Sequence, residues 1–298
     1  MTNINILRVL IAFIFLMRII LLLYFNLMLV EEKALTHWID NFYGYGSWDA
    51  RLWFIGYDED GGKVPEEVAE KINYFQNTHV RADGELCDIR ELYKHVAFRW
   101  DGPKASSFSN MYEYRFDDHA TQNTVWKNLI AFQYGYKSRK IPNLLAYQQH
   151  EFLSPSKPNE ALIQLYPLPV PHNHGWYYSW LDLPDLSLLK SRARYEAHVY
   201  ERRIHKILSK IDTHKPEVVL MYGMSNINTL KQSIQDFFQG VKFKMIRGTK
   251  FQTPQHHRVD FNGTTILITT QIPALRHNRI ETGLDWEEFG KRVKDANT

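Results

Sequence analysis

The stretch Arg51-Leu-Trp-Phe-Ile-Gly-Tyr-Asp-Glu-Asp-Gly-Gly62 decides which fold the sequence predicts. Its first part, Leu52–Ile55, is wholly apolar and ends at a glycine, which is typical of a buried parallel strand. Residues 56–62 then hold three acids between glycines, and we expect them to form a loop in which the backbone can approach a ligand. The stretch therefore predicts a central strand that ends in a functional loop.

Similar patterns recur along the chain. Apolar runs predict further strands at Glu160–Tyr166, Pro216–Gly223, Val241–Ile246 and Thr264–Thr270. Amphipathic stretches predict helices at Glu31–Phe42, Pro65–Phe75, Thr124–Tyr134, Leu186–Ile211, Asn226–Phe238 and Asp285–Val293, and the long helix carries a basic face. Strands that alternate with helices predict a mostly parallel central sheet flanked by helices, a three-layer α/β/α fold.

Composition sets broad limits on function. The chain has 298 residues, a formal net charge of +3 at pH 7 and a single cysteine, Cys87. A mildly basic charge permits DNA binding without requiring it. One cysteine excludes an intramolecular disulfide and is typical of a reducing compartment, so we expect a cytoplasmic protein. The histidines show no zinc-binding spacing, and we expect neither a metal nor a cofactor.

The N-terminal segment Ile4–Val30 is apolar except for Arg8, Arg18 and a few polar residues, and it is long enough to cross a bilayer as a helix. No small-residue cleavage site follows, which argues against a cleaved signal peptide. Either residues 1–27 are translated and anchor the protein in a membrane, or translation begins at Met28, which we favour. We treat residues 1–30 as a separate hydrophobic segment and residues 31–298 as one domain.

Ligands of open α/β sheets bind outside the carboxyl ends of the strands, so the loops after the predicted strands should meet at one cleft. The first loop offers the acids Asp58, Glu59 and Asp60 among Gly56, Tyr57 and Gly61. Clustered carboxylates raise each other's pKa, so one of them could act as a general base. Two other interpretations remain open: an acidic surface turn that caps the next helix, or a cation site.

Two further loops complete the expected cleft. The second loop carries Gln164, Tyr166, His172 and His174 on a proline-stiffened frame, and a glutamine can read a base edge with two hydrogen bonds. The third loop, Gln271–Asn278, could insert its apolar and cationic residues into a duplex from which a base has been flipped. The alternative is that both loops are structural connections with solvated side chains.

Read together, these motifs resemble those of the uracil-DNA glycosylase superfamily. The stretch Phe54–Asp58 is similar to the first motif, and Leu162–Pro167 lies at the place of the base-reading motif, with Gln164 for its asparagine. The strand Val218–Gly223 and the loop Thr270–Arg276 follow in the family's order. The histidine of the last motif is absent, because Thr270, Gln271 or Ile272 stands there, depending on the alignment.

The resemblance implies a DNA glycosylase that hydrolyses the N-glycosidic bond of a flipped base in double-stranded DNA, with no obligate protein partner. It implies catalytic roles for Asp58, which would activate water, and for Gln271 or His277, which would stabilise the leaving base. The substrate-binding residues would be Gly56, Tyr57, Glu59, Asp60, Gly61, Gln164, His172 and His174, and the DNA-binding residues Leu275, Arg276, His277 and Asn278.

The substituted motif residues favour a modified pyrimidine over uracil, and we expect glucosylated hydroxymethylcytosine in phage DNA, excised in anti-phage defence. Alternatives are a uracil or mismatch repair glycosylase, a non-catalytic nucleic-acid-binding module on the same fold, and a membrane-anchored effector.

Overall fold

A computed structural model describes residues 30–59, 61, 64–80, 86–99, 107–140, 143–170, 175–181, 183–249, 252–274 and 284–296. The expected hydrophobic segment 1–30 lies outside these residues except for Val30. No helix in the described part of the chain is both long and apolar enough to span a bilayer.

Within the described residues, seven strands form one sheet in the order β1-β3-β2-β4-β7-β6-β5. Strands β3, β2, β4 and β7 are parallel to one another, whereas β1, β6 and β5 pair antiparallel at the two sides. The strands are β1 Gly44–Tyr45, β2 Leu52–Asp58, β3 Glu160–Tyr166, β4 Val218–Tyr222, β5 Lys244–Ile246, β6 His256–Phe261 and β7 Thr264–Ile268.

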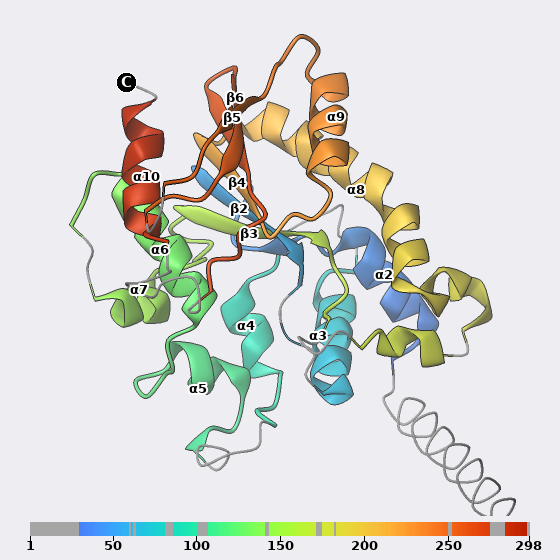
Figure 1. The fold of residues 1–298 in the computed structure, drawn as a ribbon. Helices are drawn as coiled ribbons and strands as arrows, with labels where there is room; N and C mark the ends of the chain where they lie inside the picture. Colours follow the sequence, from blue (N-terminus) through green and yellow to red (C-terminus); the bar gives the residue numbers. More distant parts are fainter. Residues whose placement is uncertain are drawn as a thin grey trace, which may run out of the picture.

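Helices cover both faces of this sheet (Figure 1). The helices are α2 Glu32–Asn41, α3 Pro65–Thr78, α4 Ile89–Lys94, α5 Met111–Phe116, α6 Thr124–Tyr136, α7 Leu144–His150, α8 Arg192–His214, α9 Ile227–Phe237 and α10 Trp286–Asp295, with 3-10 helices η2 Tyr177–Trp180 and η3 Pro184–Lys190. Neighbouring residues of β2 point to opposite layers: Phe54 packs against Phe132 of α6, and Trp53 contacts His214 of α8. The expected three-layer α/β/α fold is confirmed.

Strand β2 is buried on both faces, as its apolar sequence predicts, and Leu52–Ile55 are at most 1% exposed. It is longer than expected. The strand continues through Gly56 to Asp58, because Gly56 pairs with Gln164 of β3 and Tyr222 of β4, and Asp58 pairs with Tyr166. The loop therefore begins at Glu59 instead of Gly56.

The long basic helix also differs from expectation. The predicted helix is interrupted at Ser191, and the residues before it form the 3-10 helix η3. The hydroxyl of Ser191 accepts a hydrogen bond from the backbone N–H of Arg194 and caps the start of α8. The basic residues do not share one solvent face, because Arg203 is fully buried. The expected strand Val241–Ile246 is reduced to β5, and its partner β6 was not expected.

Candidate active site at the carboxyl ends of the central strands

The order of the parallel strands defines where a ligand can bind. Strand β2 lies between β3 and β4. After β2 the chain forms β3 on one side of it and then β4 on the other side. Such a switch point leaves a crevice outside the carboxyl ends of the strands on either side of it. Here those ends carry Asp58, Tyr166 and Gly223.

Asp58 is the last residue of β2, and it is held by the first residue of α8. The Nη2 of Arg192 donates to Asp58 Oδ2 at 2.6 Å, and the Nε of Arg192 donates to Glu196 Oε1 at 2.7 Å. Burial raises the pKa of Asp58 to about 6, although Arg192 opposes that shift and Glu196 adds to it. We expected the neighbouring acids of the loop to raise this pKa; burial and an acid of α8 do so instead.

The rings of Tyr57 and the buried Tyr166 pack against each other beside this ion pair. Their ring centroids lie 4.9 Å apart, and the hydroxyl of Tyr57 donates to Glu196 Oε2 at 3.2 Å. The guanidinium of Arg192 lies 5.8 Å from the centroid of the Tyr57 ring. Tyr57 is only partly buried, so part of this side chain is open to contact by a ligand near the Asp58 carboxylate.

Gly56 makes room for the side chains on both sides of it. A Cβ at this position would lie 2.6 Å from Gln164 Oε1 and 3.0 Å from the hydroxyl of Tyr222. Gln164 is 2% exposed, and its Oε1 has no hydrogen-bond partner among the described residues. Gln164 pairs with Gly56 in the register of β3 and β2, two residues before the pair of Tyr166 with Asp58.

Glu59 turns inward and does not face the expected cleft. It is 2% exposed, its Oε1 accepts from the Tyr45 hydroxyl at 2.5 Å, and Lys71 lies 3.5 Å from the same oxygen. Lys71 also pairs with Glu67 at 3.5 Å. Gly61 has a φ of 111°, and a Cβ there would lie 2.8 Å from Lys71 Nζ. These residues anchor the loop after β2 to the interior.

Cys87 lies at the edge of the same buried region. Its backbone exchanges hydrogen bonds with Gly44 and Gly46 next to β1, and its side chain is fully buried. Burial, reinforced by the charges of Asp88 and Glu59, raises the pKa of the Cys87 thiol far above its ordinary value.

Gln271 lies at the same edge of the sheet, after β7. Its carbonyl accepts from the backbone N–H of Gly223, and its own N–H donates to Thr269 Oγ1. These bonds join the loop after β7 to the loop after β4. The next residue, Ile272, is 39% exposed.

Five of the expected site residues, Gly56, Tyr57, Asp58, Gln164 and Gln271, are thus found near the carboxyl ends of the parallel strands β2, β3 and β7, whereas Glu59 and Gly61 anchor the loop after β2. Arg192 and Glu196 were not expected as site residues, although their i, i+4 spacing at the start of a helix is a signal for an ion pair. Seven further expected residues lie outside the described part of the chain: Asp60, His172, His174, Leu275, Arg276, His277 and Asn278.

Comparisons with models of known protein families and with curated protein sequences found no match to this chain. What the site can do therefore follows from its own chemistry. A carboxyl group with a pKa near 6 is ionised at neutral pH and is a stronger base than an ordinary aspartate. Held by the Arg192 guanidinium near the partly exposed Tyr57, it could deprotonate a water molecule next to a bound ring.

Proposed function

We propose that this protein is a DNA glycosylase that hydrolyses the N-glycosidic bond of a flipped, modified pyrimidine and leaves an abasic site. The observation that carries the proposal is the Asp58 carboxylate, which ends the central strand with a pKa raised to about 6. The buried amide of Gln164, two residues before the end of the neighbouring strand β3, supports the proposal because an amide can hydrogen-bond to the edge of a base.

In this reaction Asp58 removes a proton from water while the oxygen of that water attacks C1′ of the deoxyribose. The bond from C1′ to the base nitrogen breaks, and the base leaves with the electron pair. The ionised carboxylate also stabilises the positive charge that grows on the sugar. Arg192 holds the carboxylate in one orientation, and Gln271 donates a hydrogen bond to the departing base.

Two departures from the motifs of uracil-excising enzymes favour a modified pyrimidine as the proposed substrate. Gln164 stands in place of the asparagine, and the histidine of the last motif is absent. Glucosylated hydroxymethylcytosine in phage DNA is the specific substrate we propose, and cytoplasmic defence against phage the role.

The test uses purified protein with three DNA substrates: glucosylated phage DNA, uracil-containing DNA and unmodified DNA. Alkali cleaves the strand at abasic sites, and we expect cleavage of the glucosylated DNA alone. Asp58→Asn should abolish it, whereas Asp212→Asn, an exposed change on α8, should not. Cleavage of uracil DNA alone would assign a repair glycosylase, and no cleavage of any substrate would reject glycosylase activity.

A non-catalytic nucleic-acid-binding module is the second candidate. The observation in its favour is the 2.6 Å hydrogen bond that occupies one oxygen of Asp58, as in many structural ion pairs. Such a module would bind DNA equally well with Asp58→Asn and would release no base in any assay. A gel-shift titration of both proteins, run beside the cleavage assay, separates the two candidates.

A further inference from the structure

The amino ends of the central strands form a second polar region, at the opposite edge of the sheet from Asp58. Asn159, Arg51 and Glu217 each immediately precede one of the adjacent strands β3, β2 and β4. Their backbones are joined there, because the N–H of Leu52 donates to the carbonyl of Asn159 and that of Glu217 to the carbonyl of Arg51. The three side chains therefore have a fixed backbone frame.

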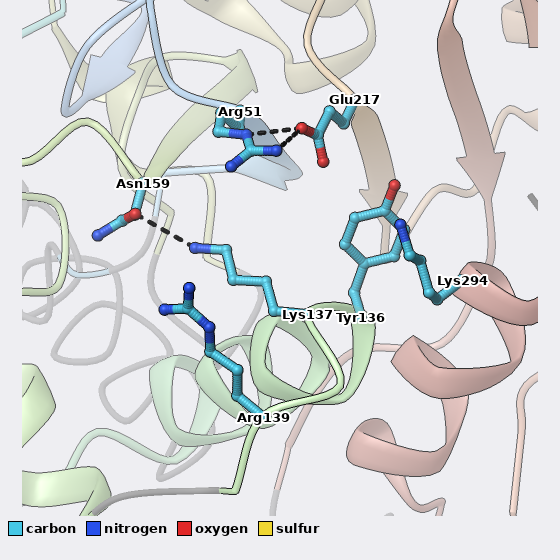
Figure 2. A pocket seen from close by; sticks show the side chains of 7 residues that line it. All are labelled: Arg51, Tyr136, Lys137, Arg139, Asn159, Glu217 and Lys294. Atoms are coloured by element: carbon cyan, nitrogen blue, oxygen red, sulfur yellow. Dashed lines mark hydrogen bonds and ion pairs between the residues drawn. The ribbon is translucent and has the colours of Figure 1, made fainter.

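Cationic side chains from the loop after α6 and from α10 face this edge and line a cavity of about 230 Å³ (Figure 2). Lys137 and Arg139 follow the end of α6, and Figure 2 shows both extending toward Arg51 and Asn159. Lys294 comes from the last turn of α10, with its Nζ 5.4 Å from the ring centroid of Tyr136. We call this cavity the amino-edge pocket.

Positive charge is in excess in the amino-edge pocket. Four cationic side chains and one carboxylate line it, which gives a net charge of +3. The carboxylate, Glu217, pairs with Arg51, and Lys137 Nζ donates to the neutral Asn159 Oδ1 at 3.2 Å. Burial lowers the pKa of Lys137, as it does for an ammonium group that has lost part of its hydration.

The ends of α6 and α10 supply a competing explanation for these cations. Each helix C-terminus carries about half a negative charge, which nearby cations stabilise. Two such ends offset about one positive charge, so that roughly +2 remains. Stabilisation of the helix ends therefore explains only part of the cationic lining.

We propose that the amino-edge pocket binds a small anion with two phosphoryl groups, of the inorganic pyrophosphate type. Lysine and arginine side chains are the groups that bind phosphoryl oxygens most often, and here they come from three separate elements. The volume is below the roughly 300–1,000 Å³ of pockets that enclose drug-sized ligands, which favours the diphosphate group without a nucleoside. The site is separate from the proposed glycosylase site and does not depend on it.

Isothermal titration calorimetry with pyrophosphate, at constant ionic strength, tests the proposal. We expect one molecule to bind per chain with a dissociation constant below about 1 mM, and inorganic phosphate to bind about tenfold more weakly because it reaches fewer cations. Lys137→Gln and, separately, Arg139→Gln should each weaken pyrophosphate binding by about tenfold or more.

Lys190→Gln removes the same charge from an exposed position that does not line the pocket, and it should leave the affinity unchanged. Arg139 is also exposed, so its replacement tests the proposal even if Lys137→Gln impairs folding. The absence of saturable binding, or equal weakening by Lys190→Gln, would overturn the proposal. Equal affinities for phosphate and pyrophosphate would overturn the diphosphate assignment.

Discussion

At the scale of single residues, Asp58 combines two opposite effects of its surroundings. Burial disfavours the ionised carboxylate, and the Arg192 guanidinium favours it. Burial is the larger effect, so the pKa of Asp58 rises to about 6. The same balance sets both the pH range in which Asp58 can act as a base and the stability of the folded chain.

Base excision should therefore depend on pH with an acid limb near 6, below which the rate falls about tenfold per pH unit as Asp58 takes up a proton. Because Arg192 lowers the pKa of Asp58, Arg192→Gln should move this limb to higher pH. Rates of base release between pH 4.5 and 9 check this, with the exposed Arg194→Gln as the control. A limb that stays in place in Arg192→Gln would show that another group titrates.

Asp58→Asn should stabilise the protein at pH 8. The raised pKa means that holding the ionised carboxylate in the folded state costs about 3 kcal/mol at high pH. This stability is fully present below about pH 4, where the unfolded-state carboxyl is also protonated, and is lost as the pH rises through 6. The asparagine side chain of the variant carries no charge at any pH, so the variant does not lose this stability as the pH rises.

Urea unfolding of wild type and Asp58→Asn at pH 8 and pH 4 measures this effect. The variant should be more stable at pH 8, by up to about 3 kcal/mol, and the difference should shrink at pH 4. Asp212→Asn should show no such pH-dependent gain. A variant that is less stable than wild type at pH 8 would mean that the bond to Arg192 outweighs burial.

At the scale of elements, helix α8 completes the side of the sheet that the short strand β1 leaves open. β1 pairs with β3 only at Leu162 and Ile163. Beyond them, the buried Arg203 donates to the carbonyls of Leu165 and Gln164 at 2.7 and 2.8 Å. Its guanidinium also lies 4.1 Å from the ring centroid of Tyr43. One side chain thus takes the place of a strand neighbour and positions the end of β3.

Arg203→Lys should destabilise the protein by about 2–4 kcal/mol, because an ammonium cannot reach all the buried carbonyls that the planar guanidinium satisfies. Arg202→Lys is the matched control, since the side chain of Arg202 is 52% exposed and pairs with Asp40 at the surface. Urea unfolding gives both values. A loss no larger than that of Arg202→Lys would show that water or Tyr43 can satisfy this edge.

Element boundaries show which parts of the structure the sequence could predict. Local patterns predicted β3 residue for residue and five of the six expected helices to within a few positions, because apolar periodicity reflects burial. The short helices α4, α5 and α7 were not expected. The extension of β2 through Gly56 could not be predicted, since it depends on pairing with strands more than one hundred residues away. Asp58 was expected at this edge because it follows an apolar run in the sequence. Its partners on α8 lie more than one hundred residues away and were not expected.

At the scale of the whole molecule, the two polar regions lie at opposite edges of one sheet. Asp58 ends β2, and Arg51 immediately precedes it. Seven strand residues at about 3.3 Å each separate these edges by roughly 20 Å, more than twice the Debye length of about 8 Å at physiological salt. Charges bound at one edge should be largely screened from the other.

DNA and pyrophosphate should therefore bind independently. The affinity for a duplex should change by less than about 0.5 kcal/mol when pyrophosphate saturates the amino-edge pocket. Fluorescence anisotropy with labelled DNA, with sulfate at equal ionic strength as the control, measures this. Competition that exceeds the sulfate effect would mean that DNA reaches the amino edge or that the two edges are coupled.

The deep burial of Cys87 has a practical consequence. Alkylating reagents attack the thiolate, and a fully buried thiol with a strongly raised pKa offers almost none. Because the chain has no second cysteine, a new one can be labelled selectively in an otherwise native protein. A cysteine in place of the exposed Ile272, beside the loops that follow β4 and β7, would carry a fluorophore to the candidate active site. Its emission would report DNA binding without a background signal from Cys87.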